Sequence, residues 1–269
     1  MKSFEVKKQS KLSKSVLSNI DGLSYSAIMK LLRSKDVKVN GVRVNKDIQV
    51  NVGDKVEVYA KDTFMPTAKV IFEDDNVLVV DKPSGVLSET LFDNLKEKYN
   101  ELFFIHRLDR NTSGLMIFAK NTDAEKSLLL GFKNHTFIKK YLATVYGEPK
   151  ENKKVLTAYL LKDKDASLVK IFDKKVAGSV EIKTGYEVKE RYLDTSLLEV
   201  TLFTGKTHQI RAHLAHIGHF IVGDGKYGNG EFNRSKKVST QMLKAYKLTL
   251  NFDKNDFLYY LDKKTFVSE

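Results

Sequence analysis

The sequence predicts an α+β protein with a largely antiparallel mixed sheet and a small additional N-terminal unit. Three observations support this prediction. From residue 69 onward, apolar segments of strand length follow one another with few helical segments and no regular strand–helix alternation. Residues 61–68 contain Pro66 and resemble a linker between residues 1–60 and 69–269. With 42% hydrophobic residues among 269, the chain can form a sizeable core.

The chain is strongly basic, and its charge is unevenly distributed. The formal net charge is +12, and residues 1–60 carry half of it, with twelve Lys or Arg against six Asp or Glu. Lysines outnumber arginines by 39 to seven, and lysine suits phosphate contacts better than contacts to base edges. This composition favours a polyanionic partner, although a surface that only maintains solubility would also be rich in lysine.

The absence of cysteine excludes several classes of site. Without Cys there are no disulfides, iron–sulfur clusters, thiolate zinc sites or cysteine nucleophiles, and a reducing, cytoplasmic location is expected. The longest aliphatic run is only Val77–Val80, and residues 1–14 hold five lysines and no apolar run. The sequence therefore predicts neither secretion nor a membrane span.

In residues 1–60, a helix followed by a hairpin is predicted. Ser24 or Ser26 can cap the helix, whose apolar residues recur at helical spacing: Ile28, Leu31 and Leu32. Valines then alternate on both sides of Asn40-Gly41, a favoured two-residue hairpin turn. Gly53 and Asp54 turn the chain again before a strand with Val56 and Val58.

In residues 69–269, strands predominate. Two apolar strands within Val70–Val80 flank an acidic turn at residues 73–76, and a helix-like segment with Leu91 and Leu95 follows. Five more strands are predicted at Leu115–Ala119, Tyr141–Tyr146, Lys154–Leu160, Ser179–Val188 and Ser196–Phe203. A helix with Ile210 and Leu214 is expected after the last of them.

The first candidate site is the dense polar loop His106–Gly114. Its Asp109 lies between Arg107 and Arg110, which would keep the carboxylate ionised and able to act as a base or nucleophile. An Asp that only caps a turn and pairs with neighbouring arginines would give the same sequence.

The second candidate site is Thr204–His213, where a strand ends and a helix begins. The start of a helix is suited to binding anions. Four of the six histidines lie within twelve residues, namely His208, His213, His216 and His219. Their spacing spreads them around a helix without a thiolate or an H-E-x-x-H carboxylate, so no metal is expected.

Two further segments have alternative interpretations. Gly223–Gly228 matches G-x-G-x-x-G, but residues 229–233 are predicted to continue as a loop, so close backbone approach is favoured over dinucleotide binding. Tyr141 follows Lys139 and Lys140; it is either an ordinary strand tyrosine or an aromatic face on which a base can stack.

Leu31–Val44, together with Val52–Asp54, resembles the αL RNA-binding motif. This resemblance implies that residues 1–60 bind RNA through basic side chains, for which the candidates are Lys30, Arg33, Lys35, Lys38 and Arg43.

Residues 69–252 resemble the RluA-type pseudouridine synthases, which act on large-subunit ribosomal RNA or tRNA. The resemblance rests on the Asp74–Gly85 opening, the His106–Gly114 loop, Lys140-Tyr141, the Thr204–Gly228 block and a closing pattern from Ala245 to Phe252. It implies that Asp109 is catalytic, that Tyr141 stacks on the target base and that Arg211 pairs with Asp109. Arg107 would replace the flipped nucleotide in the base stack, and the other expected substrate contacts are His106, Lys206, Thr207 and His208.

The sequence departs from the usual family pattern at four positions, none of which removes a catalytic group. Asn111 replaces the usual Asp, Lys206 replaces the usual Arg, and Phe220 replaces the usual Pro. In addition, Ser88 stands where many members have His.

The resemblance implies an isomerase that needs no cofactor and acts, as a monomer, on ribosomal RNA or tRNA. Two routes stay open, attack by Asp109 at the anomeric carbon and abstraction of a ribose proton by Asp109. The alternative functions are a catalytically silent RNA-binding or ribosome-assembly protein with the same fold, and a metal-dependent hydrolase that uses the histidines.

Overall fold

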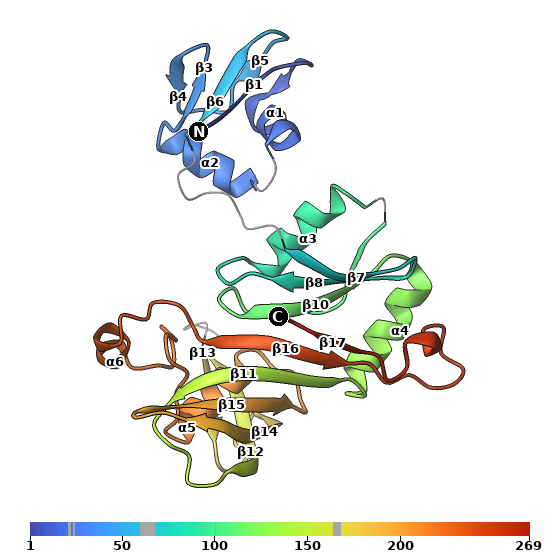
Figure 1. Cartoon of the computed structure of the whole chain (residues 1–269), viewed down its shortest axis with the longest axis vertical. Coiled ribbons are helices and arrows are strands. Elements are labelled where there is room, and N and C mark those ends of the chain that lie inside the picture. Colours follow the sequence, from blue (N-terminus) through green and yellow to red (C-terminus); the bar gives the residue numbers. More distant parts are fainter. Residues whose placement is uncertain (21–22, 24, 60–67, 100, 164–167) are drawn as a thin grey trace. The chain divides into compact units, whose positions relative to one another are not determined.

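The structure is a computed structural model that describes all residues except 21–22, 24, 60–67, 100 and 164–167 (Figure 1). The chain divides into two compact units, Met1–Thr67 and Ala68–Glu269. The proposed cap Ser24 and all of the expected linker except Ala68 fall outside the described residues.

The first unit combines two helices with small antiparallel sheets. β1 (Lys2–Glu5), β6 (Lys55–Val58), β3 (Val37–Val39) and β4 (Val42–Val44) pair in that order, and β2 (Ser10–Lys11) pairs with β5 (Gln49–Val50). The helices are α1 (Leu12–Asn19) and α2 (Tyr25–Arg33). Their apolar faces meet the sheet in a core that includes Val6, Leu12, Val16, Ile28 and Leu32.

The predicted helix and hairpin of this unit are confirmed. Ile28 and Leu32 of α2 are fully buried. Asn40 and Gly41 both have positive φ, 50° and 80°, as a type I′ turn requires, and Val39 pairs with Val42 across the turn. In contrast, β1 and α1 were not predicted, because their few apolar residues are separated by lysines and serines.

The second unit is built on one long sheet. Its strands pair in the order β13-β12-β14-β15-β11-β16-β10-β8-β7, with β17 beside β16 and β9 beside β10. The bounds are β7 (Lys69–Glu73), β8 (Val77–Lys82), β9 (Phe103–Phe104), β10 (Ser113–Ala119), β11 (Ile138–Tyr146), β12 (Lys153–Asp163), β13 (Leu168–Phe172), β14 (Val180–Arg191), β15 (Thr195–Leu202), β16 (Leu243–Thr249) and β17 (Thr265–Val267). Among the described residues, only β10 and β16 pair in parallel, so the predicted largely antiparallel sheet is confirmed.

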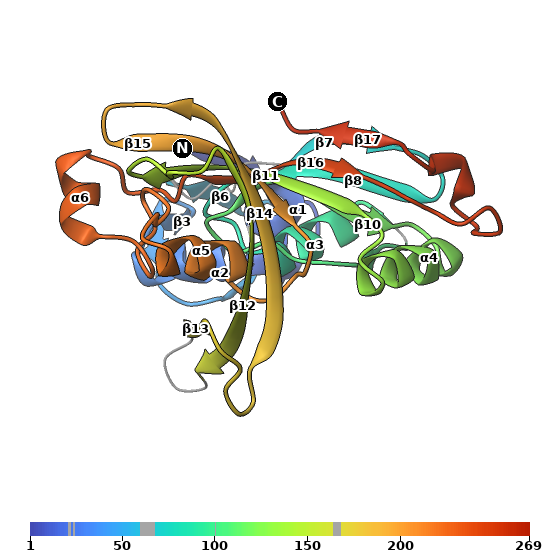
Figure 2. The ribbon, with the colours of Figure 1, turned by 90° about the horizontal axis from the view of Figure 1, so that it is seen from below.

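The helices of the second unit lie against different parts of the sheet (Figure 2). They are α3 (Ser88–Lys96), α4 (Thr122–Lys133), α5 (Gln209–His216), α6 (Gly230–Ser235) and the 3₁₀ turn η1 (Tyr259–Leu261). α4 lies near β10, whereas α5 lies near β13 and β14. The predicted α3 and α5 are confirmed, and α4 was not predicted.

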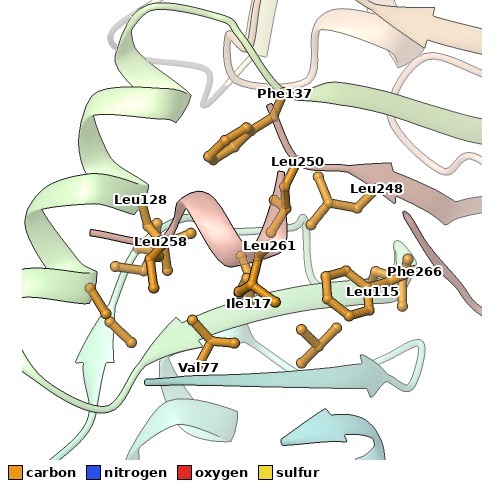
Figure 3. Close-up of a cluster of buried hydrophobic side chains, with 14 residues drawn as sticks. Val77, Leu115, Ile117, Leu128, Phe137, Leu248, Leu250, Leu258, Leu261 and Phe266 are labelled. Atoms are coloured by element: carbon orange, nitrogen blue, oxygen red, sulfur yellow. The ribbon is translucent and has the colours of Figure 1, made fainter. Parts of the chain in front are cut away.

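One hydrophobic core joins α4 to β10 and β16 (Figure 3). In this core, Leu128 of α4 lies beside Leu258, and Leu261 lies beside Ile117 of β10. The ring of Phe137 meets two other aromatic rings edge-on at 5.2 Å, those of Phe132 and Phe252. This core fixes β10, which the polar loop 106–112 enters directly.

A second core attaches α5 to the middle of the sheet. Ile210 and Leu214 of α5 are buried with Val145 of β11 and Val200 of β15, and Tyr141 packs against the same cluster. The first turn of α5 is therefore held close to the strand that carries Tyr141.

The G-x-G-x-x-G segment forms a turn with close backbone contacts. A Cβ atom at Gly223 would lie 2.0 Å from the carbonyl oxygen of Thr240, which explains a glycine there. The expectation that residues 229–233 continue as a loop was wrong, because α6 begins at Gly230. Asn229 caps this short helix by accepting hydrogen bonds from the N–H groups of Glu231 and Phe232.

Candidate active site

A cavity of about 200 Å³ lies between the polar loop, β11 and the start of α5. This is several times the roughly 30 Å³ that one water molecule occupies in the liquid. The predicted site residues that line the cavity are Arg107, Asp109, Tyr141, Lys206, Thr207, His208 and Arg211. The fold thus brings together residues that are up to about one hundred positions apart in the sequence.

At the centre of the site, Arg211 lies between two carboxylates. Its Nη1 atom donates to Oδ2 of Asp109 at 2.7 Å, so the pairing implied by the resemblance is present. Its Nε and Nη2 atoms donate to Oδ2 and Oδ1 of Asp224, at 2.7 and 2.9 Å. The Asp224 side chain is completely buried and that of Arg211 is 8% exposed, whereas that of Asp109 is 22% exposed and lines the cavity.

Arg211 and Asp224 stabilise each other's charged forms. Burial alone would lower the pKa of Arg211, but its hydrogen bonds to Asp224 and Asp109 outweigh burial and raise this pKa. Burial would likewise raise the pKa of Asp224, but the hydrogen bond from Arg211 and those from the N–H groups of Lys226 and Tyr227 lower it. Arg211 and Asp224 therefore form a permanently charged pair beside Asp109.

The arginines adjacent to Asp109 in sequence do not hold its carboxylate. Arg107 pairs with Glu89 of α3 at 2.7 Å, and both side chains are exposed. Arg110 donates from Nε to the carbonyl oxygen of Gly85 at 3.0 Å. Successive residues of a tight turn point in different directions, so the cation that reaches Asp109 comes from α5. The expectation that Arg107 and Arg110 hold the Asp109 carboxylate was therefore wrong, because Arg211 holds it instead.

Buried polar groups fix the backbone around Asp109. Lys82 is fully buried, and its Nζ donates to the carbonyl oxygens of Pro83, Val86 and Arg110 at 2.8–3.1 Å. Burial lowers the pKa of Lys82 to about 8, against the opposing effect of Asp109 and Asp81. The Oγ of Ser88 donates to the carbonyl oxygen of Leu108 and accepts from the N–H of the same residue, at 2.8 and 3.0 Å.

Tyr141 lies on β11 immediately after a β-bulge, where the register with β16 shifts between Lys140 and Tyr141. Its ring packs against the hydrophobic core that contains Ile210 and Leu214 of α5, and the residue also lines the cavity. Burial, together with the charge of Asp109, raises the pKa of its hydroxyl group. The side chain therefore presents a neutral aromatic surface to whatever enters the cavity.

The turn into α5 presents His208 to Asp109. His208 has a left-handed backbone conformation, with φ of 53°, and its Nε2 lies 3.9 Å from Oδ2 of Asp109. The turn is fixed by Gln209, whose Oε1 accepts from the Thr204 hydroxyl at 2.9 Å and from the Lys206 N–H at 3.1 Å. Burial lowers the pKa of His208, so its imidazole is neutral at pH 7.

His106 is not among the residues that line this cavity. Its Nε2 accepts a hydrogen bond from the Ile117 N–H at 3.1 Å, and its ring stacks on Phe132 with 4.5 Å between centroids. Burial and the nearby Lys139 lower its pKa to about 3. The structure thus places His106 beside the α4 core, and a substrate contact for it stays a prediction.

The clustered histidines have separate partners. His208 contacts Tyr227, His213 contacts Thr184, His216 contacts Asp173 and His219 contacts the carbonyl oxygen of Tyr146. Among the described residues, no three His, Cys, Asp or Glu side chains are grouped so that they could hold a metal ion.

In the first unit, the five basic residues expected to contact RNA lie on α2, in the turn after it and on the hairpin β3–β4. Lys30, Arg33, Lys35 and Arg43 are exposed and Lys38 is partly exposed. Lys38 and Arg43 both lie over the ring of Tyr59, at 5.1 and 5.6 Å from its centroid.

Comparison with known proteins identifies the family. Residues 76–216 match the family model described as RNA pseudouridylate synthase. The chain belongs to this family. It is 30% identical over 268 residues to the ribosomal large subunit pseudouridine synthase C of Haemophilus influenzae, covering 89% of this chain and 83% of that protein. The corresponding protein of Escherichia coli K12 is 32% identical over 240 residues, covering 80% and 75%.

Solved structures of the family share the fold. Human RNA pseudouridylate synthase domain containing 1 matches with a TM-score of 0.62 and 28% identity, over 70% of this chain and 80% of that chain. Human RNA pseudouridylate synthase domain containing 4 has a TM-score of 0.61 and 21% identity over 75% and 88%, and shows the fold alone. The predicted RluA-type family, pseudouridine synthase fold and isomerase activity are confirmed, with RNA as the partner.

Asp224 and Tyr227, like Lys82 and Gln209, contribute to this site but were not singled out by the sequence analysis. Asp224 and Tyr227 lie in Gly223–Gly228, where the glycines drew attention to the backbone.

No helix in the described part of the chain has the length and apolar character needed to cross a membrane.

Proposed function

We propose that this enzyme converts uridine to pseudouridine in large-subunit ribosomal RNA, with Asp109 as the catalytic group. The observation that carries the proposal is the position of Asp109, which lines the cavity while Arg211 holds it at 2.7 Å. The choice of RNA follows the two bacterial relatives, which are named as ribosomal large subunit enzymes. Transfer RNA is the alternative substrate. On either RNA the enzyme would act in the cytoplasm as a monomer.

The chemistry needs few groups. The bond between the uracil ring and C1′ of the ribose breaks, the ring rotates, and a bond forms from C5 of uracil to C1′, without net oxidation or loss of a group. N1 departs with the electron pair of the broken bond and gains a proton, and C5 loses its proton, so no proton is gained or lost overall. Asp109 serves either by attack at C1′ or by abstraction of a ribose proton, and both routes require a carboxylate. Arg211 orients that carboxylate.

Before reaction, the uridine must leave the RNA stack, which costs a few kcal/mol. Stacking of the uracil on the neutral ring of Tyr141 would offset part of this cost. Arg107 lies at the rim of the cavity with its side chain 64% exposed, and after leaving Glu89 it would occupy the vacated place in the stack. Lys206 and the N-terminal turn of α5 at Thr207 and His208 would contact the flanking phosphates.

Replacing Asp109 tests the catalytic assignment. The Asp109→Asn variant is expected to bind large-subunit ribosomal RNA at least as tightly as the wild type, because one negative charge is removed, and to form no pseudouridine. Pseudouridine is mapped in large-subunit ribosomal RNA and tRNA after incubation with each protein. Asp123→Asn, on the surface of α4 and paired with Lys126, is the matched control.

The outcomes separate the alternatives. Turnover by Asp109→Asn would contradict the catalytic assignment, and modification of tRNA alone would contradict the choice of ribosomal RNA. Binding by the wild-type protein without any pseudouridine would indicate the catalytically silent RNA-binding protein.

A further inference from the structure

We propose that the turn Gly223–Gly228 positions the two groups that face Asp109: Asp224 orients Arg211, and Tyr227 orients His208. This inference rests on the proposed catalytic role of Asp109. It assigns to the G-x-G-x-x-G segment a part in the site that its glycines alone did not suggest.

Asp224 fixes the plane of the Arg211 guanidinium. Two hydrogen bonds, of 2.7 and 2.9 Å, join Nε and Nη2 to the two oxygens of the Asp224 carboxylate. This leaves Nη1 to donate to Asp109. Asp224 is itself held by the backbone N–H groups of Lys226 and Tyr227, at 2.8 and 3.1 Å. Rotation of the guanidinium away from Asp109 would break both charged hydrogen bonds inside a fully buried contact.

Tyr227 determines which nitrogen of His208 carries the proton. Its hydroxyl oxygen accepts a hydrogen bond from the N–H of Val169 in β13, at 2.9 Å, so its own proton is available for Nδ1 of His208, also at 2.9 Å. With Nδ1 as acceptor, the neutral imidazole carries its proton on Nε2, the atom 3.9 Å from Asp109.

Tyr227 also lies against Arg211, the second group that faces Asp109. The Cζ atom of Arg211 is 5.2 Å from the centroid of the Tyr227 ring, and the His208 ring meets that ring edge-on at 5.6 Å. One side chain thus packs against both groups that approach Oδ2 of Asp109. Because burial keeps His208 neutral, it presents an N–H group to Asp109 without adding a second cation.

The first experiment reads the geometry without using activity. Side-chain ¹⁵N NMR of the full-length protein without RNA, with the His208 signal assigned from His208→Gln, is expected to show a protonated Nε2 and an unprotonated Nδ1. Tyr227→Phe keeps the ring and removes the hydroxyl, so the Nε2–H form is expected to lose its predominance. A wild-type signal with the proton on Nδ1, or an unchanged tautomer in Tyr227→Phe, would overturn the assignment to Tyr227.

The assignment of Asp224 is tested in the same spectra. The Nε–H of Arg211, identified by its loss in Arg211→Lys, is expected to exchange slowly with solvent in the wild-type protein. Rapid exchange would show that Asp224 does not hold it. This measurement does not require Asp224→Asn to fold. Where that variant does fold, its kcat is expected to fall at least tenfold with RNA affinity changed less than twofold, and an unchanged kcat would also overturn the proposal.

The second experiment asks whether Tyr227 acts through His208. On large-subunit ribosomal RNA, Tyr227→Phe is expected to lower kcat about tenfold and to leave KM within twofold. Tyr99→Phe, which removes a surface hydroxyl bonded to Glu73 at 3.0 Å, is the matched control and should leave both unchanged. The Tyr227→Phe, His208→Gln double variant should be no slower than His208→Gln alone.

These results distinguish the positioning role from the function itself. Additive effects in the double variant, or a loss confined to KM, would overturn the positioning role. If the wild-type protein forms no pseudouridine in any RNA, the proposed function fails, and the NMR measurements still decide whether the turn sets Arg211 and His208.

Discussion

At the scale of single residues, local environment separates groups that are close in the sequence. His106 and Asp109 belong to the same polar loop, yet His106 stacks on Phe132 beside the α4 core and Asp109 lines the cavity. The sequence placed both in the substrate site because polarity alone does not show on which side of a loop a side chain lies. Burial then gives His106 a structural role, as a neutral acceptor for the Ile117 N–H.

Replacing His106 should change the pH dependence of stability. Burial lowers its pKa from 6.5 to about 3, so between these values the unfolded chain binds a proton that the native protein does not. The contribution of His106 to the free energy of unfolding is complete above pH 6.5 and decreases as the pH falls, by about 1.4 kcal/mol per unit. His106→Gln retains an acceptor for Ile117 and does not titrate.

The measurement is urea unfolding of the wild type and His106→Gln at pH 7 and pH 5. When the pH falls from 7 to 5, the free energy of unfolding of the wild type is expected to decrease by about 2 kcal/mol more than that of the variant. Equal losses would contradict the prediction. A raised KM for RNA in His106→Gln would instead support the substrate contact predicted from the sequence.

At the scale of elements, Gly114 is the position where two strands allow no side chain. It lies opposite Ala245 in the parallel contact of β10 with β16 and has φ of 112°. A Cβ atom there would lie 2.2 Å from the carbonyl oxygen of Ala245. Since the Asp109 loop enters β10 at this point, separation of the two strands would also displace the Asp109 carboxylate.

Gly114→Ala is therefore expected to destabilise the protein by roughly 3 kcal/mol or more, through overpacking and an unfavourable φ. Gly225→Ala is the matched control, since a Cβ there meets nothing within 4 Å and φ is not positive. Thermal unfolding of both variants checks the prediction. A Gly114→Ala protein as stable as Gly225→Ala would contradict it.

The elements that the sequence predicted are those whose signal is local. The Asn40-Gly41 turn and the alternating strands of the long sheet carry their pattern within a few residues. α4 carries a weaker pattern, because Leu129 and Leu130 are 43% and 52% exposed beside the buried Leu128. Its best signal was Asn121, whose side chain accepts from the Ala124 N–H and caps the helix.

Only those site residues that belong to motifs of the family could be predicted from the sequence. Asp109, Tyr141 and Arg211 were identified by resemblance, and the structure brings them to one cavity. The part of Asp224 was not predictable, because an Asp between two glycines is also typical of an ordinary turn. Only its fully buried contact with Arg211, on a different element, distinguishes it.

At the scale of the whole molecule, the basic charge of residues 1–60 predicts a separate contribution to RNA affinity. The second unit has its own buried cores, so it should remain folded when residues 1–67 are deleted. The deletion is expected to weaken RNA binding at least tenfold. The deletion should also make the RNA-binding constant less sensitive to salt concentration, because the protein then neutralises fewer phosphates.

Binding titrations between 50 and 200 mM salt, with circular dichroism to verify folding, test this prediction. A variant of the full chain with Lys30, Arg33, Lys35, Lys38 and Arg43 changed to alanine should show a large part of the same loss. Unchanged affinity and salt dependence in both proteins would contradict an RNA-binding role for the first unit.

The arrangement of Arg211 between two carboxylates has a consequence for how a nucleotide can enter. Arg211 and the buried Lys82 offset the two carboxylates and His208 is uncharged, so the innermost part of the pocket has little net charge, while Arg107 and Lys206 supply positive charge at its mouth. A phosphate group is attracted to the entrance and, in the interior, would be buried without a free cation among the described residues, whereas an uncharged uracil ring meets no such barrier. Electrostatics alone thus orient the nucleotide with its base inward and its backbone outward.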